Sequence, residues 1–167
     1  GYIEIVKWLH LIGADIHAEN DRAFRWSCQN GHFEIAIWLH QLGADIHVNN
    51  DEAFRGSCRK GHIEIAKWLY RLKVENPGNE SDANIRAIID YAFIRSCQND
   101  RIEVVKWLHQ LGADIHADND LAFRSCCEYA YIEMAKWLYE LGANVHADND
   151  YVFKNSPKNI VDWLNSL

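Results

Sequence analysis

Cysteine and histidine are the side chains of this sequence best suited to chemistry, because both bind metals and a thiolate is also a nucleophile. The chain has five Cys and nine His among its 167 residues. They recur at regular positions, and the clearest series are Cys28, Cys58, Cys97 and Cys127, and His17, His47, His116 and His146. One hypothesis is therefore a metal- or redox-responsive switch, and the other is that both series serve a repeated structure.

The spacing of the cysteines favours the structural interpretation. Helices that stack side by side lie about 8–10 Å apart, whereas zinc needs sulfur ligands at about 2.3 Å and a disulfide needs Cα atoms within about 7 Å. We interpret the cysteines as small core residues and expect no metal and no cofactor. The histidines titrate near neutral pH, and a pH-sensitive array is the alternative to our interpretation that each one braces its own loop.

An enzyme would need a polar constellation that does not repeat. The sequence contains no glycine-rich phosphate loop, no G-x-S-x-G motif and no H-E-x-x-H motif. We therefore expect a protein without catalytic activity.

The elements that position these side chains repeat about every 30 residues. The phrase GADIH or GANVH ends at each histidine of the series, and Asp-x-Ala-Phe recurs at Asp21, Asp51, Asp90 and Asp120. Most tryptophans fall on one ladder: Trp8, Trp38, Trp68, Trp107, Trp137 and Trp163. We expect the ladder to pack between repeats rather than form an exposed row that binds a ligand.

Each repeat is predicted to be two short helices, as residues 21–43 illustrate. Asp21 is the predicted N-cap of a first helix, and Gly31-His32 breaks it. The predicted apolar stripes are Ala23, Phe24, Ser27 and Cys28 on the first helix, and Ile35, Trp38, Leu39 and Leu42 on the second. Gly43 is predicted to end the second helix in a left-handed conformation. A pair this small buries its apolar side only by stacking on its neighbours, which predicts a solenoid.

These residues resemble the ankyrin repeat. Gly31-His32-x-Glu-Ile-Ala followed by Trp-Leu and Gly43-Ala-Asp is similar to that family's second helix and loop. The family's Thr-Pro-Leu-His opening is replaced by x-Ala-Phe-Arg, so that Arg25, Arg55 and Arg124 stand where its loop-bracing histidine would be. The period is three residues short, which implies stubby fingers. This variant resembles the ankyrin arrays of giant DNA viruses of amoebae, and that resemblance implies a viral protein.

The whole chain, 1–167, is expected to be one all-α ankyrin-type helix-turn-helix solenoid with short connecting fingers. Residues 1–19 match only a second helix and loop, which we interpret as part of a truncated array or a fragment. The predicted repeats cover about 20–49, 50–82, 90–119 and 120–149, with a short C-terminal capping repeat at 150–167. An insertion at about 73–82 is either a harmless addition or a contact loop or bend, and a long helix from about Ala83 to Asn99, capped by Ser81 or Asp82, should follow it.

Composition excludes some partners. The net charge is −7 and Lys and Arg form no basic face, so we expect no nucleic acid. No apolar run approaches the roughly 18 residues that span a bilayer, so we expect no membrane. An odd number of cysteines favours reduced thiols and a cytoplasmic, intracellular location, in a host cell or virion if the protein is viral. A monomer is expected.

Function should lie where the copies differ. Three positions on one side of each first helix change from copy to copy, whereas the phenylalanine does not. The predicted binding residues are Arg22, Trp26, Gln29, Glu52, Arg59, Tyr91, Arg95, Gln98, Leu121, Glu128 and, near the rim, Tyr129. The resemblance implies that they line a concave face, and the sequence therefore predicts an adaptor for a partner protein. A structural spacer within a longer array is a further alternative.

Overall fold

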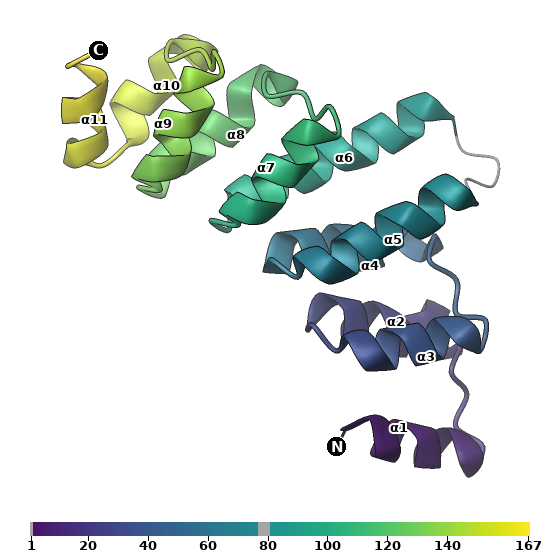
Figure 1. The fold of residues 1–167 in the computed structure, drawn as a ribbon. Coiled ribbons are helices and arrows are strands. Elements are labelled where there is room, and N and C mark those ends of the chain that lie inside the picture. The colour runs from purple at the N-terminus through teal and green to yellow at the C-terminus, as the bar shows by residue number, and fades with distance from the viewer. Residues whose placement is uncertain (1, 77–80) are drawn as a thin grey trace. The chain divides into compact units, whose positions relative to one another are not determined.

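The computed structural model describes residues 2–76 and 81–167 (Figure 1). Within these ranges the chain forms eleven helices and no strand, which confirms the predicted all-α class. The chain consists of two compact units, Gly1–Glu80 and Ser81–Leu167. Residues 77–80 of the predicted insertion lie outside the described ranges.

The first unit contains five helices: α1 (Tyr2–Leu11), α2 (Ala18–Gln29), α3 (Phe33–Gln41), α4 (Val48–Lys60) and α5 (Ile63–Glu75). The second contains six: α6 (Asp82–Cys97), α7 (Ile102–Gln110), α8 (Ala117–Glu128), α9 (Ile132–Glu140), α10 (Ala147–Asn155) and α11 (Lys158–Leu164). Each first helix packs on the second helix of its own repeat and on the next first helix of the same unit. Helix-turn-helix stacking is therefore present in both units.

The helix pair at residues 21–43 follows the sequence pattern closely. Phe24 and Cys28 are fully buried, and Ile35 and Leu39 are buried on α3. Gly31 and Gly43 have positive φ angles of 78° and 100°, as predicted for residues that end a helix. The prediction was wrong for Leu42, which is 37% exposed because α3 ends one residue earlier, at Gln41.

The fingers are single left-handed turns. Three consecutive residues adopt positive φ in four connectors: Glu19–Asp21, Asn49–Asp51, Asp118–Asp120 and Asp148–Asp150. Asn and Asp tolerate this conformation better than other residues with a Cβ. These turns fall within the first residues of helices such as α2 and α8, and arginines further along the same helices hold them: Arg25 donates to the carbonyls of Asn20 (2.9 Å) and Glu19 (2.8 Å), and Arg124 donates to those of Asn119 (2.8 Å) and Asp118 (2.9 Å). These arginines therefore brace the loop, as the resemblance implied.

Asp21 joins two connectors instead of capping its own helix, so the N-cap prediction was wrong. Asp21 itself has a left-handed φ of 53°, and α2 has no side-chain cap hydrogen bond. The carboxylate accepts from Nδ1 of His17 (2.7 Å) and from the backbone N–H of Asp45 (3.3 Å) in the next connector. Asp120 accepts the N–H of Asn144 in the same way (3.1 Å). The recurring histidines each pair with the aspartate four residues later, as expected for residues that brace a loop.

The repeat that lacks the GADIH phrase uses a lysine instead. Helix α5 has 13 residues where α3 has 9, and its extra turn carries Lys73. The Lys73 ammonium donates to Oδ2 of Asp51 at 2.8 Å, and the two side chains are 4% and 3% exposed. The Lys73 ammonium therefore replaces the backbone N–H of the next connector, which donates to the aspartate in other repeats.

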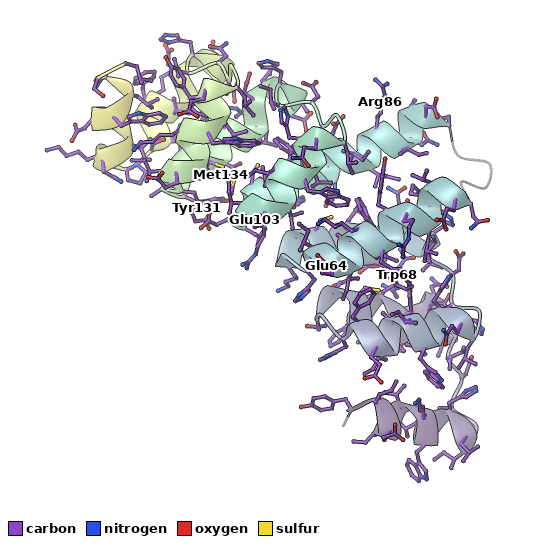
Figure 2. All side chains as sticks on the ribbon, viewed as in Figure 1. Glu64, Trp68, Arg86, Glu103, Tyr131 and Met134 are labelled. Atoms are coloured by element: carbon purple, nitrogen blue, oxygen red, sulfur yellow. The ribbon has the colours of Figure 1, made fainter. Side chains whose placement is uncertain are left out.

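Two further predictions agree with the structure. Helix α6 begins at Asp82, and the Ser81 side chain accepts from the N–H of Asn84 (3.3 Å), so Ser81 is the cap. Four of the ladder tryptophans pack between repeats: edge-on rings join His10 to Trp38, His40 to Trp68, His109 to Trp137 and Tyr139 to Trp163, with centroids 5.5–6.0 Å apart. Trp68, labelled in Figure 2, is half-buried, whereas Trp8 is 57% exposed.

Candidate protein-binding surface

The exposed side of α2 carries an arginine stacked on an aromatic ring. The Arg22 guanidinium lies 5.3 Å from the centroid of the Trp26 ring and pairs with Glu19 at 2.6 Å. Trp26 is 55% exposed although it is a large apolar side chain. A rigid aromatic surface beside a charged group is typical of residues that anchor a protein partner.

Helix α6 repeats this arrangement in the second unit with the two residue types exchanged. The Arg95 guanidinium lies 5.0 Å from the centroid of the Tyr91 ring, at the same repeat positions as Trp26 and Arg22. Tyr91 is 40% exposed, and Arg95 also donates to Oε1 of Gln98 (2.9 Å). Each unit therefore presents one exposed arginine–aromatic pair on its first complete repeat.

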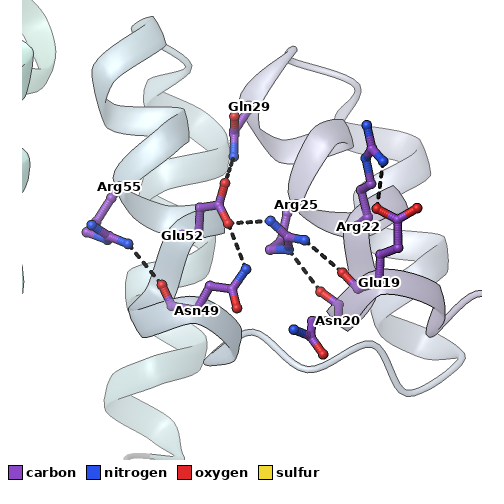
Figure 3. A network of polar contacts seen from close by, with 8 residues as sticks. All are labelled: Glu19, Asn20, Arg22, Arg25, Gln29, Asn49, Glu52 and Arg55. Atoms are coloured by element: carbon purple, nitrogen blue, oxygen red, sulfur yellow. Dashed lines mark hydrogen bonds and ion pairs between the residues drawn. The ribbon is translucent and has the colours of Figure 1, made fainter.

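Several predicted residues instead connect neighbouring first helices. Glu52 of α4 accepts from Gln29 of α2 (3.0 Å), from Arg25 and from Asn49 (Figure 3). Burial raises the pKa of the Glu52 carboxyl, but these hydrogen bonds and the Arg25 charge outweigh that effect, so the pKa lies below its ordinary value. Ionised Glu52 thus holds two repeats together.

The second unit contains equivalent connections. Gln98 of α6 donates to the Ser125 hydroxyl of α8 (3.2 Å), and Tyr151 of α10 donates to the Glu128 carboxylate (3.0 Å). Variation between copies identified these positions, but part of that variation arises because a residue in one repeat forms a hydrogen bond with a residue in the next repeat. The sequence did contain a signal for these contacts. Counting from the recurring aspartate of each repeat, a polar residue at position +8 in one repeat is followed by a polar residue at position +1 or +5 in the next.

The remaining predicted residues are accessible to different extents. Arg59 is exposed on α4, and Tyr129 is 50% exposed beside Tyr131, with ring centroids 6.0 Å apart. Leu121 is half-buried. The accessible members of the predicted set are thus mainly Arg22, Trp26, Arg59, Tyr91, Arg95 and Tyr129.

Two pockets that the sequence did not predict flank Trp26 in the first unit. The larger, about 500 Å³, lies between α1, α2 and α3 and is lined mainly by apolar groups, including Val6, Ala23, Ile35 and Leu39. The smaller, about 310 Å³, is lined by Asp15 and Ile16 of the connector and by Ala18, Glu19, Arg22, Ala23 and Trp26 of α2. Apolar pockets of this size are large enough to receive a partner's side chains.

The cysteines are poorly placed for surface chemistry. All five are free and buried. Burial raises the pKa of the Cys28 thiol to about 12, and burial together with the neighbouring Cys126 raises that of Cys127 to about 12. Reactive cysteines need the opposite environment, one that stabilises the thiolate. Over residues 2–76 and 81–167, no cluster of three His, Cys, Asp or Glu is arranged to hold a metal ion.

Comparison with known proteins identifies the repeat type. Residues 1–80 match the family model for ankyrin repeats, which comprises three copies. A search of curated proteins found no match. The match identifies ankyrin repeats in residues 1–80, and the helix pairs of both units are consistent with an ankyrin-type helix-turn-helix architecture. Ankyrin repeats are generally protein–protein interaction modules. In the described part of the chain, no helix is both long and apolar enough to cross a membrane.

Proposed function

We propose that this protein is a non-enzymatic adaptor that binds a partner protein through the exposed side of its first helices, the concave face that the ankyrin resemblance implies. The observation that carries the proposal is the pair of exposed arginine–aromatic stacks, Arg22–Trp26 and Tyr91–Arg95. Exposing two such stacks at matching positions contributes little to the core, whereas aromatic and arginine side chains dominate the energetics of protein interfaces.

The buried thiols support the adaptor over a redox- or metal-responsive switch. A switch needs thiols that ionise and react, and burial raises the pKa of Cys28 and Cys127 well above neutral pH. Free thiols also favour a reducing, intracellular compartment, which we propose as the location. We further propose that the chain acts as a monomer.

The test is affinity capture from lysate of the source cell followed by mass spectrometry. Wild type is compared with a triple variant, Trp26→Ala, Tyr91→Ala and Arg95→Ala, whose folding is checked by circular dichroism. The matched control is Trp8→Ala, which removes an equally exposed tryptophan from the second helix of a repeat. A protein captured by wild type and by Trp8→Ala, but lost by the triple variant, would support the proposal.

Two other results would contradict it. Equal capture by all three forms would exclude the first helices as the binding surface. Absence of any specific capture would favour the spacer, a segment that only separates other parts of a longer array.

A further inference from the structure

The turn that follows helix α8 has a backbone that its sequence does not favour. Ala130 has a φ of 62°, a left-handed conformation that is strained for alanine, whereas Gly31 and Gly61 occupy the same repeat position in the first unit. Asp100, the counterpart of Ala130 in the repeat of α6, tolerates this conformation better. Residues held in strained conformations cluster at functional sites, so this turn is a candidate for one.

The charge at the end of α8 is also unfavourable for the helix. The last turn of α4 carries Arg59 and Lys60 and that of α6 carries Arg95, whereas the last turn of α8 has no basic residue and ends at Glu128. The C-terminus of a helix is the negative end of its dipole, so a carboxylate there costs stability and a cation is favourable. Acidic residues also outnumber basic ones in the second unit. The end of α8 therefore attracts a positive charge that the helix does not itself supply.

A neutral donor holds the Glu128 carboxylate in place. The carboxylate accepts a hydrogen bond from the Tyr151 hydroxyl at 3.0 Å, and over residues 2–76 and 81–167 no cation pairs with it. The hydrogen bond to Glu128 raises the pKa of the Tyr151 phenol, so Tyr151 donates without bringing a charge of its own. An ionised carboxylate can accept several hydrogen bonds, and Glu128 therefore has acceptor capacity left for a charged donor.

An exposed aromatic ring stands beside this carboxylate. Tyr129 is 50% exposed, and its ring centroid lies 6.0 Å from that of Tyr131, which is labelled in Figure 2. Elsewhere in the same unit, a guanidinium joins such a ring to a carboxylate. Arg124 lies 5.1 Å from the centroid of the Tyr151 ring and pairs with Asp148 at 2.7 Å. The turn after α8 thus offers an aromatic ring and a carboxylate, and within the described residues no guanidinium lies over its rings.

From this geometry we infer that the turn at residues 128–131 binds an arginine side chain of the partner protein. The guanidinium stacks on the exposed Tyr129 ring and pairs with the Glu128 carboxylate at the end of α8. Arginine fits better than lysine, because its planar guanidinium stacks on a ring and donates two parallel hydrogen bonds at the same time. This inference rests on the proposed adaptor function and names the chemistry of one partner residue.

The test is an NMR titration of the full-length protein, labelled in its tyrosine rings, with the peptide acetyl-Gly-Gly-Arg-Gly-Gly-amide. The ring signals of Tyr129 and Tyr131, assigned with Tyr129→Phe and Tyr131→Phe, should shift saturably. The dissociation constant should be about 10 mM or lower, as expected for a single anchoring side chain. The same peptide with citrulline, which keeps the shape of arginine without its charge, should bind about fivefold more weakly.

Two protein variants separate the turn from its surroundings. Glu128→Gln keeps an acceptor for the Tyr151 hydroxyl but removes the charge, and it should weaken binding of the arginine peptide about fivefold. The matched control is Glu133→Gln, because Glu133 is an exposed carboxylate on the next helix, α9, and lies 3.8 Å from Lys136. This control should bind the peptide as wild type does, and circular dichroism should be unchanged in both variants.

Three results would overturn the inference. One is the absence of saturable shifts of the Tyr129 and Tyr131 signals at tens of millimolar peptide. Another is equal binding of the arginine and citrulline peptides, or of the arginine peptide by wild type and Glu128→Gln. The third is a shift of the same signals that depends on protein concentration without peptide, which would identify a second copy as the source of the arginine. Capture from lysate does not depend on the peptide, so a captured partner together with any of these results would contradict this inference alone.

Discussion

Replacing Lys73 by methionine is expected to destabilise the first unit by about 3–5 kcal/mol, the cost typical of removing one partner from a buried ion pair. Methionine keeps most of the aliphatic volume, so the main loss is the ammonium group. Asp51, whose side chain is 3% exposed, would keep the more distant His47 Nδ1, 3.2 Å away, but would lose the ammonium at 2.8 Å. The buried carboxylate would then lack most of its compensating charge.

The assay is urea unfolding followed by circular dichroism. Lys67→Met is the matched control, because Lys67 lies on the same helix but is 47% exposed and 3.8 Å from Glu64. An exposed pair of this kind contributes at most about 1 kcal/mol. In the double variant Asp51→Asn with Lys73→Met, the loss should be smaller than the sum of the two single losses, since no unpaired charge remains.

A loss below about 1 kcal/mol for Lys73→Met, similar to that of Lys67→Met, would refute the reasoning. It would mean that water or another donor compensates Asp51, and that Lys73 does not replace the missing connector. Additive losses in the double variant would lead to the same conclusion.

Three other perturbations test the local structure. Arg124→Met should cost about 2–3 kcal/mol in urea unfolding because it removes two hydrogen bonds that hold the left-handed turn at Asp118–Asp120 and a third to Asp148 of the next connector, whereas Arg101→Met, at an exposed position, should cost less than about 0.5 kcal/mol. Gly43→Ala should cost about 1 kcal/mol because φ there is 100°, and Gly43→Asn should cost less; equal losses would contradict this explanation. Burial raises the thiol pKa of Cys28 from 9.0 to about 12, so the contribution of this neutral thiol to stability is complete below pH 9 and is lost as pH rises towards 12. The free energy of unfolding of wild type should therefore fall more over this pH range than that of Cys28→Ala. Equal falls in the two proteins would exclude this thiol as the cause.

The sequence by itself determined the helix pairs and where they end. Phe24 and Cys28 recur at helical spacing, and Gly31 and Gly43 stand where the chain must leave the helix, so both features depend on residues close together in the chain. The match of residues 1–80 to ankyrin repeats reflects the same local pattern. Recurrence also indicated that the histidines serve the structure, because a residue present in each connector meets the same neighbours each time.

Only the tertiary structure decided how neighbouring repeats are joined. The partners Gln29 and Glu52 are 23 residues apart, and Lys73 and Asp51 are 22 apart, so their contacts depend on how one helix pair lies on the next. The same stacking explains why Asp21 accepts a hydrogen bond from the N–H of Asp45 in the next connector and does not cap its own helix, as the sequence had predicted. The larger pocket beside Trp26 is likewise formed by residues from three separate helices, α1, α2 and α3. Local periodicity fixes which side of a helix is apolar, but the contacts across the stack arise only when the repeats are brought together in space.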